Sequence, residues 1–80
     1  MTFAEWVKTA ERKTDLSILE NAFGFEVENA VAAIVYDPGV VAELSDGQFF
    51  TLLYTNEYTG TREEIEKVLW EDYAEKETRE

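Results

Sequence analysis

The pattern of hydrophobic and polar residues predicts a helix at each end of the chain. Four apolar residues near the N-terminus have the i, i+3, i+4, i+7 spacing of one helix face: Phe3, Trp6, Val7 and Ala10. Thr2 and Glu5 have the spacing of a capping box, in which each side chain accepts a hydrogen bond from the other residue's backbone N–H. A second box, Thr61 to Glu64, precedes a long helix whose apolar stripe is formed by Ile65, Val68, Leu69 and Tyr73.

The middle of the chain has the pattern of an antiparallel sheet. Three apolar segments are predicted to be strands: residues 31–36, 40–44 and 49–54. Asp37-Pro38-Gly39 predicts the turn between the first two strands. Asp46-Gly47 lies between the second and third apolar segments, which is the strongest short-range signal for a hairpin.

Three further segments have weaker patterns. A short helix is predicted near residues 16–23, with Gly24 at the C-terminal position where a positive φ is usual. Residues 25–30 fit the spacing of either a strand or a helix, and we favour a strand with a bend near Asn29. Residues 55–60 are polar and are predicted to form a loop.

Together these elements predict an α+β fold in a single domain over residues 1–80. A three-stranded antiparallel meander is flanked by N-terminal and C-terminal helices in the order αβββα, with the extra short helix near residues 16–23. The tail at about residues 77–80 is expected to fray.

The composition excludes most familiar catalytic and metal-binding chemistry. The chain has no Cys, which removes disulfides and zinc–thiolate sites, and no His, which removes the commonest general base and metal ligand. Its four glycines are isolated, so the sequence contains no phosphate-binding loop. Paired carboxylates can perform acid–base catalysis, but the sequence marks no site for it. We therefore expect a protein that is not an enzyme and that uses no metal and no cofactor.

The net charge of −11 is unevenly distributed along the chain. There are 18 Asp and Glu residues against 7 Lys and Arg, and residues 14–61 contain eight acids but no Lys or Arg. Direct binding to nucleic acid or to an anionic membrane is not expected, because affinity for phosphate depends largely on Lys and Arg. The longest apolar run, residues 30–36, is far shorter than the roughly 20 residues that span a bilayer. We expect a cytoplasmic protein.

Three explanations account for this acidity. Carboxylates on alternate strand residues lie about 6.6–6.8 Å apart, and those at i, i+4 on a helix lie about 5–6 Å apart, which resembles the phosphate spacing along nucleic acid. Such a surface can occupy a groove lined by Lys and Arg as a decoy for nucleic acid. Net charge for solubility, or adaptation to high salt, explains the same composition without a partner.

The decoy interpretation assigns partner binding to carboxylates with two aromatic anchors. In the C-terminal helix, Glu64, Glu71 and Glu75 lie within about 40° of one another. Trp70 lies away from the apolar stripe, where it either anchors a partner or packs on a neighbouring element. Tyr58 either grips a partner or closes the edge of the core. The complete predicted partner-binding set is Glu26, Glu28, Glu43, Glu57, Tyr58, Glu64, Trp70, Glu71 and Glu75.

In size, acidity and mixture of helix and strand, the chain resembles phage-encoded anti-defence proteins, such as anti-CRISPR proteins and DNA-mimicking anti-restriction proteins. This resemblance covers overall character and involves no shared motif. It implies a stoichiometric inhibitor that blocks the nucleic-acid-binding surface of a host defence complex, in the cytoplasm of the host cell.

A function of a different class is a small interaction or assembly module, monomeric or homodimeric. Such a module recognises its protein partner through apolar contacts. Residues 49–54 are apolar on both faces of the predicted strand, so they are the candidate for a sheet edge or a dimer interface.

Overall fold

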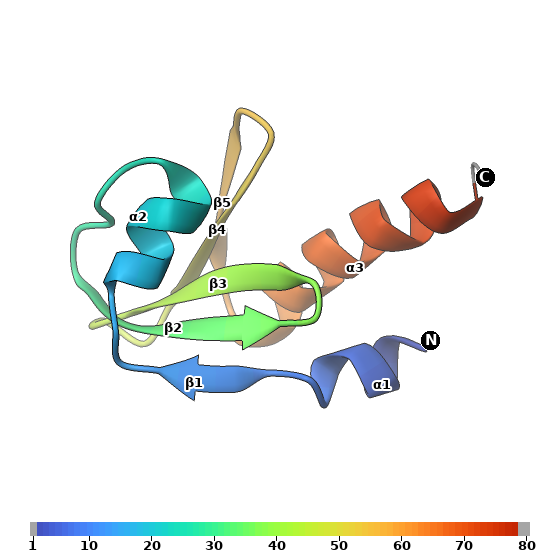
Figure 1. Ribbon diagram of the computed structural model, residues 1–80, viewed down its shortest axis with the longest axis horizontal. Coiled ribbons are helices and arrows are strands. Elements are labelled where there is room, and N and C mark those ends of the chain that lie inside the picture. Colours follow the sequence, from blue (N-terminus) through green and yellow to red (C-terminus); the bar gives the residue numbers. More distant parts are fainter. Residues whose placement is uncertain (1, 79–80) are drawn as a thin grey trace.

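The computed structural model describes residues 2–78, with side chains described as far as residue 74. The part of the predicted frayed tail beyond residue 78 lies outside the described residues. In chain order the elements are α1 (Phe3–Val7), β1 (Glu11–Lys13), α2 (Ser17–Phe23), β2 (Ala30–Tyr36), β3 (Gly39–Leu44), β4 (Phe49–Leu53), β5 (Asn56–Gly60) and α3 (Arg62–Thr78) (Figure 1). None of these helices is long and apolar enough to cross a membrane.

All five strands form one antiparallel sheet in the order β1-β2-β3-β4-β5. The predicted α+β fold is confirmed, and the three predicted strands correspond to β2, β3 and β4. The prediction of a three-stranded meander is wrong, because β1 and β5 add one strand at each edge. Helix α2 contacts β3, whereas α3 contacts β4 and β5. Figure 1 shows these two helices lying to either side of the strands.

The first helix is shorter than its apolar spacing predicts. Its capping box forms as expected: the Glu5 N–H donates to the Thr2 hydroxyl at 3.2 Å, and the Thr2 N–H donates to the Glu5 carboxylate at 3.0 Å. The helix nevertheless ends at Val7, before Ala10. Residues 11–13 form β1 by pairing with β2, so the hydrogen bonds of the sheet decide the conformation of three charged residues.

Two predictions about the remaining segments are wrong. Residues 25–29 form a loop and not a strand, because Gly24 and Asn29 adopt left-handed conformations with φ of 84° and 65°. Residues 56–60 form strand β5 and not a loop. This strand pairs with β4 along its whole length, from Asn56 opposite Leu53 to Gly60 opposite Phe49.

The main core lies between the sheet and helices α1 and α3. Trp6 is completely buried in it, and the indole N–H donates to the carbonyl oxygen of Pro38 at 2.8 Å. The indole stacks on the ring of Tyr36, with centroids 4.4 Å apart. Ile65 and Leu69, two of the four residues in the apolar stripe predicted for α3, are buried in the same cluster.

A smaller core lies on the other face of the sheet, beneath α2. Leu19 from this helix packs there with Ala33, Ala42 and Phe50 from three strands. Because successive strand residues point to opposite faces, Ala33 contributes to the smaller core and Ile34 to the main one. The central strands are therefore covered on both faces, and β1 and β5 are the edges of the sheet.

Candidate functional site

Three predicted partner-binding carboxylates line one pocket on the face of the sheet that carries α2. Glu26 and Glu28 come from the loop after α2, and Glu57 comes from β5. The pocket has a volume of about 340 Å³. Its remaining lining is apolar and consists of Phe25, Val27, Leu44 and Phe50. We call it the acidic pocket.

The loop that carries Glu26 and Glu28 is held in place by backbone and aromatic contacts. At its end, the Ser45 N–H donates to the carbonyl oxygen of Asn29 at 2.8 Å. Near its start, the ring of Phe25 lies 6.3 Å from the rings of both Phe23 and Phe50, measured between centroids. Phe25 still keeps 40% of its surface exposed. The pocket therefore offers an accessible aromatic ring beside its carboxylates.

No ion pair between described side chains involves a carboxylate of the acidic pocket. Residues 14–61 contain no Lys or Arg, and Glu26, Glu28 and Glu57 take part in none of the ion pairs between described residues. All three glutamates are exposed. Several carboxylates around one pocket produce a negative potential that favours a bound cation. The lining suits a long basic side chain, whose alkyl stem packs on apolar surface while its charged head meets carboxylate.

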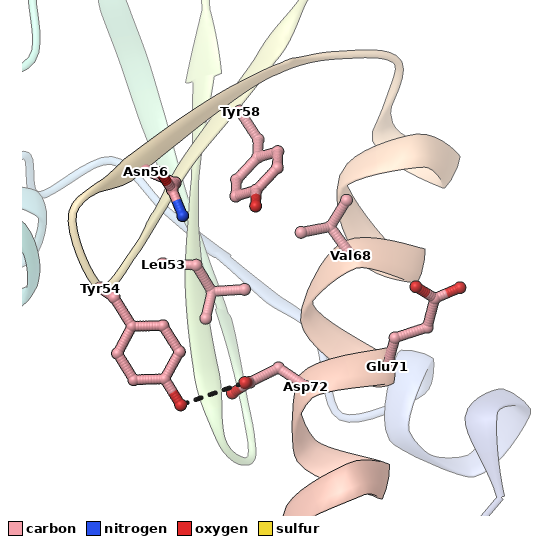
Figure 2. Close-up of a pocket in the computed structure, with 7 residues that line it drawn as sticks. All are labelled: Leu53, Tyr54, Asn56, Tyr58, Val68, Glu71 and Asp72. Carbon is pink, nitrogen blue, oxygen red and sulfur yellow. Dashed lines mark hydrogen bonds between the residues drawn. The ribbon is translucent and has the colours of Figure 1, made fainter.

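A second pocket lies between the β4–β5 hairpin and α3, and we call it the hairpin–helix pocket (Figure 2). It has a volume of about 410 Å³ and includes two predicted partner-binding residues, Tyr58 and Glu71. Figure 2 shows Leu53 and Tyr58 from the hairpin and Val68 from α3 pointing into the same gap. The full lining is Leu53, Tyr54, Asn56, Tyr58, Val68, Glu71 and Asp72.

Tyr54 closes one end of the hairpin–helix pocket in an unusual backbone conformation. It lies in the two-residue turn between β4 and β5 at a φ of 59°, where such turns normally have Gly, Asn or Asp. The left-handed conformation costs an L-residue about 1–2 kcal/mol. The Tyr54 hydroxyl donates to the Asp72 carboxylate at 3.2 Å, and 68% of the residue is exposed. Backbone strain of this kind is concentrated at binding sites, so Tyr54 belongs to the candidate surface.

The two pockets lie on opposite faces of the β4–β5 hairpin. Along β5, Asn56 and Tyr58 line the hairpin–helix pocket, whereas Glu57 lines the acidic pocket. This alternation follows from the geometry of a strand, in which successive side chains point to opposite faces. A single edge strand therefore contributes to both pockets.

Glu43 does not line the acidic pocket, although it belongs to the same predicted partner-binding set as the pocket carboxylates. It is opposite Phe49, on the face of the main core, and it is paired with Arg12 of β1. The Arg12 Nε and Nη2 groups donate to the two carboxylate oxygens at 3.1 and 2.9 Å. These hydrogen bonds lower the pKa of Glu43 below its usual range. Its charge is balanced within the chain.

The remaining predicted residues belong to α3. Glu64 is exposed near the start of the helix, and a Cβ atom placed on Gly60 would lie 2.7 Å from its carboxylate, which puts the carboxylate beside the end of β5. Trp70 packs on Phe3 and Trp6 with ring centroids 6.1 and 5.8 Å away, so it has the packing role that was the alternative to an anchor. Glu75 is in α3, and its side chain lies outside the described part of the chain.

Phe25, Tyr54 and Asp72 are among the lining residues that were absent from the predicted set. Phe25 resembles an ordinary core residue in the sequence, and in the fold it follows the left-handed Gly24 and lines the acidic pocket. Tyr54 and Asp72 come together because α3 packs on the hairpin, which no local pattern encodes. The sequence signal that could have identified Tyr54 was its pairing with Tyr58 on either side of a short polar segment.

Among the described residues, no group of three or more Asp and Glu side chains is placed to hold a metal ion. No protein-family model, curated protein or solved structure matches the chain. Its function is therefore inferred from the geometry and charge of the two pockets.

Proposed function

We propose that the protein is a non-enzymatic inhibitor that binds the basic surface of a nucleic-acid-binding protein and competes there with nucleic acid. The observation that carries the proposal is the acidic pocket, which is lined by Glu26, Glu28 and Glu57 together with apolar residues. A Lys or Arg side chain from the partner matches this combination of carboxylate and apolar surface. In its narrower form, which the overall resemblance implies, the partner is a host defence complex.

The net charge supports a partner that normally holds nucleic acid. A protein with a charge of −11 is attracted over long range to strongly positive surfaces, which raises its rate of association. Grooves that bind phosphate are lined by Lys and Arg and provide such surfaces. Occupation of the groove by a folded acidic domain excludes nucleic acid both by volume and by charge.

The alternative function, a module that binds its partner through the apolar residues 49–54, has little support. Strand β4 pairs with β5 along its whole length, and Phe49 and Phe50 also pair with β3. Phe49 and Phe50 pack in the main and the smaller core respectively. The apolar character of this strand on both faces is explained by the two cores.

The proposal is tested by capturing partners from a cell lysate at low salt and releasing them with increasing salt or with duplex DNA. The test variant replaces the three glutamates of the acidic pocket with Gln: Glu26, Glu28 and Glu57. The matched control makes the same change at three exposed glutamates elsewhere: Glu11, Glu20 and Glu63. Each variant removes three negative charges, from −11 to −8, so a difference between them reports position and not net charge.

We expect capture of a nucleic-acid-binding protein that is released by both salt and DNA. Its affinity should fall at least tenfold for the acidic-pocket variant and change less than threefold for the control variant. A partner that binds both variants equally, or that neither salt nor DNA releases, would contradict the proposal.

A further inference from the structure

The two edges of the sheet differ in their protection against pairing with another chain. Strand β1 has three residues, and all three are charged: Glu11, Arg12 and Lys13. Very short edge strands and edge charges are the devices by which natural proteins prevent strand addition. Strand β5 has five residues, contains neither Lys nor Pro and carries one charge, at Glu57. By the same criteria β5 is the open edge.

Strand β5 is also regular enough to accept another strand. Its five residues pair with β4 without a bulge, and no other strand within residues 2–78 pairs with it. In an antiparallel pair, alternate residues direct their backbone N–H and C=O groups away from the partner strand. An extended chain lying along β5 can therefore form a new ladder with it.

We infer that β5 is the docking edge for an extended segment of the partner, which adds as a sixth strand and carries adjacent Lys or Arg residues. This inference rests on the proposed function, because it states how the basic partner is held. An added strand alternates its side chains between the same two faces as β5. Its successive residues therefore lie beside the acidic pocket and the hairpin–helix pocket in turn.

Acidic residues lie on both faces of the sheet beside β5, and their positions determine which partner sequence can bind there. On one face Glu57 is accompanied by Glu26 and Glu28, and on the other the hairpin–helix pocket includes Glu71 and Asp72. A segment with one basic residue on each face matches both sets of carboxylates. Consecutive basic residues satisfy this condition, whereas basic residues two positions apart fall on one face.

The aromatic residues of the hairpin strengthen the match on the second face. Tyr54 and Tyr58 line the hairpin–helix pocket beside its carboxylates. Arg and Lys interact favourably with the faces of aromatic rings, and their stems pack on apolar surface. The same charges argue against a second copy of this chain as the added strand, because each copy carries −11.

The test measures binding of the full chain to the synthetic peptide acetyl-TVKRVT-amide by fluorescence anisotropy. The isomer acetyl-TKVRVT-amide has the same composition but places both basic residues on one face. A third peptide is TVKRVT with its four central amides N-methylated, which keeps the charges and removes the backbone donors. Two protein variants are compared, Glu57→Gln on β5 and Glu11→Gln on β1, because both residues are exposed acids on edge strands.

We expect TVKRVT to bind at least fivefold tighter than its isomer and at least tenfold tighter than the N-methylated peptide. Glu57→Gln should weaken binding at least fivefold, and Glu11→Gln less than twofold. Hydrogen exchange at the amides of residues 56–60 should slow when TVKRVT is bound.

Equal binding of the N-methylated peptide, or unchanged exchange in β5, would overturn strand addition while leaving the proposed function in place. Strand addition would also be overturned if none of the three peptides binds while capture of a basic partner still depends on the acidic pocket. Failure of the peptides together with failure of that capture would refute both proposals.

Discussion

The hydroxyl group of Tyr36 provides a sharp test of how the main core is stabilised. It donates to the carboxylate of Glu66 at 2.6 Å, and the two residues are only 4% and 7% exposed. The Arg62 Nε group donates to the same carboxylate oxygen at 3.3 Å. Tyr36→Phe keeps the ring that stacks on Trp6 and removes only the hydroxyl. The buried carboxylate of Glu66 then loses its shorter hydrogen bond and keeps the longer one from Arg62.

The magnitude follows from the charge and burial of the acceptor. A hydrogen bond to a charged group contributes about 1.5–3 kcal/mol to stability. For an 80-residue domain, each kcal/mol lowers the midpoint of thermal unfolding by about 6 °C, which gives a decrease of about 9–18 °C. The same change at Tyr54, whose hydroxyl bonds Asp72 at 3.2 Å on the surface, should cost about 0.5 kcal/mol.

The pH dependence gives a second, independent signature. Burial, together with hydrogen bonding to Glu66, raises the pKa of Tyr36 well above its usual value near 10. The folded state therefore keeps a proton that the unfolded chain loses. The stabilisation is complete below about pH 10 and decreases as the pH rises further, by up to about 1.4 kcal/mol per pH unit. Tyr36→Phe removes this contribution.

Urea unfolding followed by tryptophan fluorescence measures both effects, because Trp6 stacks directly on Tyr36. The wild type, Tyr36→Phe and Tyr54→Phe are compared at pH 7 and between pH 9.5 and 11. A loss below about 0.5 kcal/mol for Tyr36→Phe at pH 7 would refute the assignment of this bond to the stability of the core. An alkaline decrease identical in the wild type and Tyr36→Phe would refute the linkage.

Other predictions concern the turns and the surface ion pair, each measured by urea unfolding. Gly39→Ala should cost about 1–3 kcal/mol, because φ is 127° and the new Cβ would lie 2.9 Å from the Tyr73 hydroxyl; a loss below 0.5 kcal/mol would contradict this. Tyr54→Val should be at least 1 kcal/mol less stable than Tyr54→Asn, since Asn tolerates a positive φ and a β-branched residue does not; equal stabilities would refute strain at the turn. Glu43→Gln should cost less than 1 kcal/mol at pH 7, and the difference should vanish as the pH falls through the lowered pKa of Glu43; a difference that persists at pH 2 would contradict the linkage to Arg12.

Elements with local signals were predictable from the sequence. The capping box at Thr2, the left-handed Gly24 and the Asp46-Gly47 turn each depend on residues close together in the chain. Strand β5 was missed because its hairpin turn, Tyr54-Thr55, lacks the Gly, Asn or Asp that normally marks such a turn. Strand β1 was missed for another reason. Its three charged residues have no strand pattern and become a strand only by pairing with β2.

The candidate site was predictable as residue types but not as an arrangement. Glu26, Glu28 and Glu57 were predicted individually, and their meeting depends on the left-handed Asn29 and on the pairing of β5 with β4. Glu43 has the same chemistry in the sequence, yet it is paired with Arg12 from the strand that was missed. The charge of a residue can therefore be predicted from the sequence, whereas its pairing with a residue far away in the same chain cannot.

The placement of the charges, more than their number, favours recognition over solubility. Solubility and salt tolerance depend on net charge and impose no particular arrangement of the basic residues. Among the described side chains, every ion pair lies within or between β1, β3 and α3: Arg12–Glu43, Lys13–Glu11, Arg62–Glu66 and Lys67–Glu63. None of these ion pairs involves a glutamate of the acidic pocket, and residues 14–61 contain no Lys or Arg. Ion pairs at one part of the described surface and carboxylates outside those pairs at another are the arrangement expected where a partner supplies the cation.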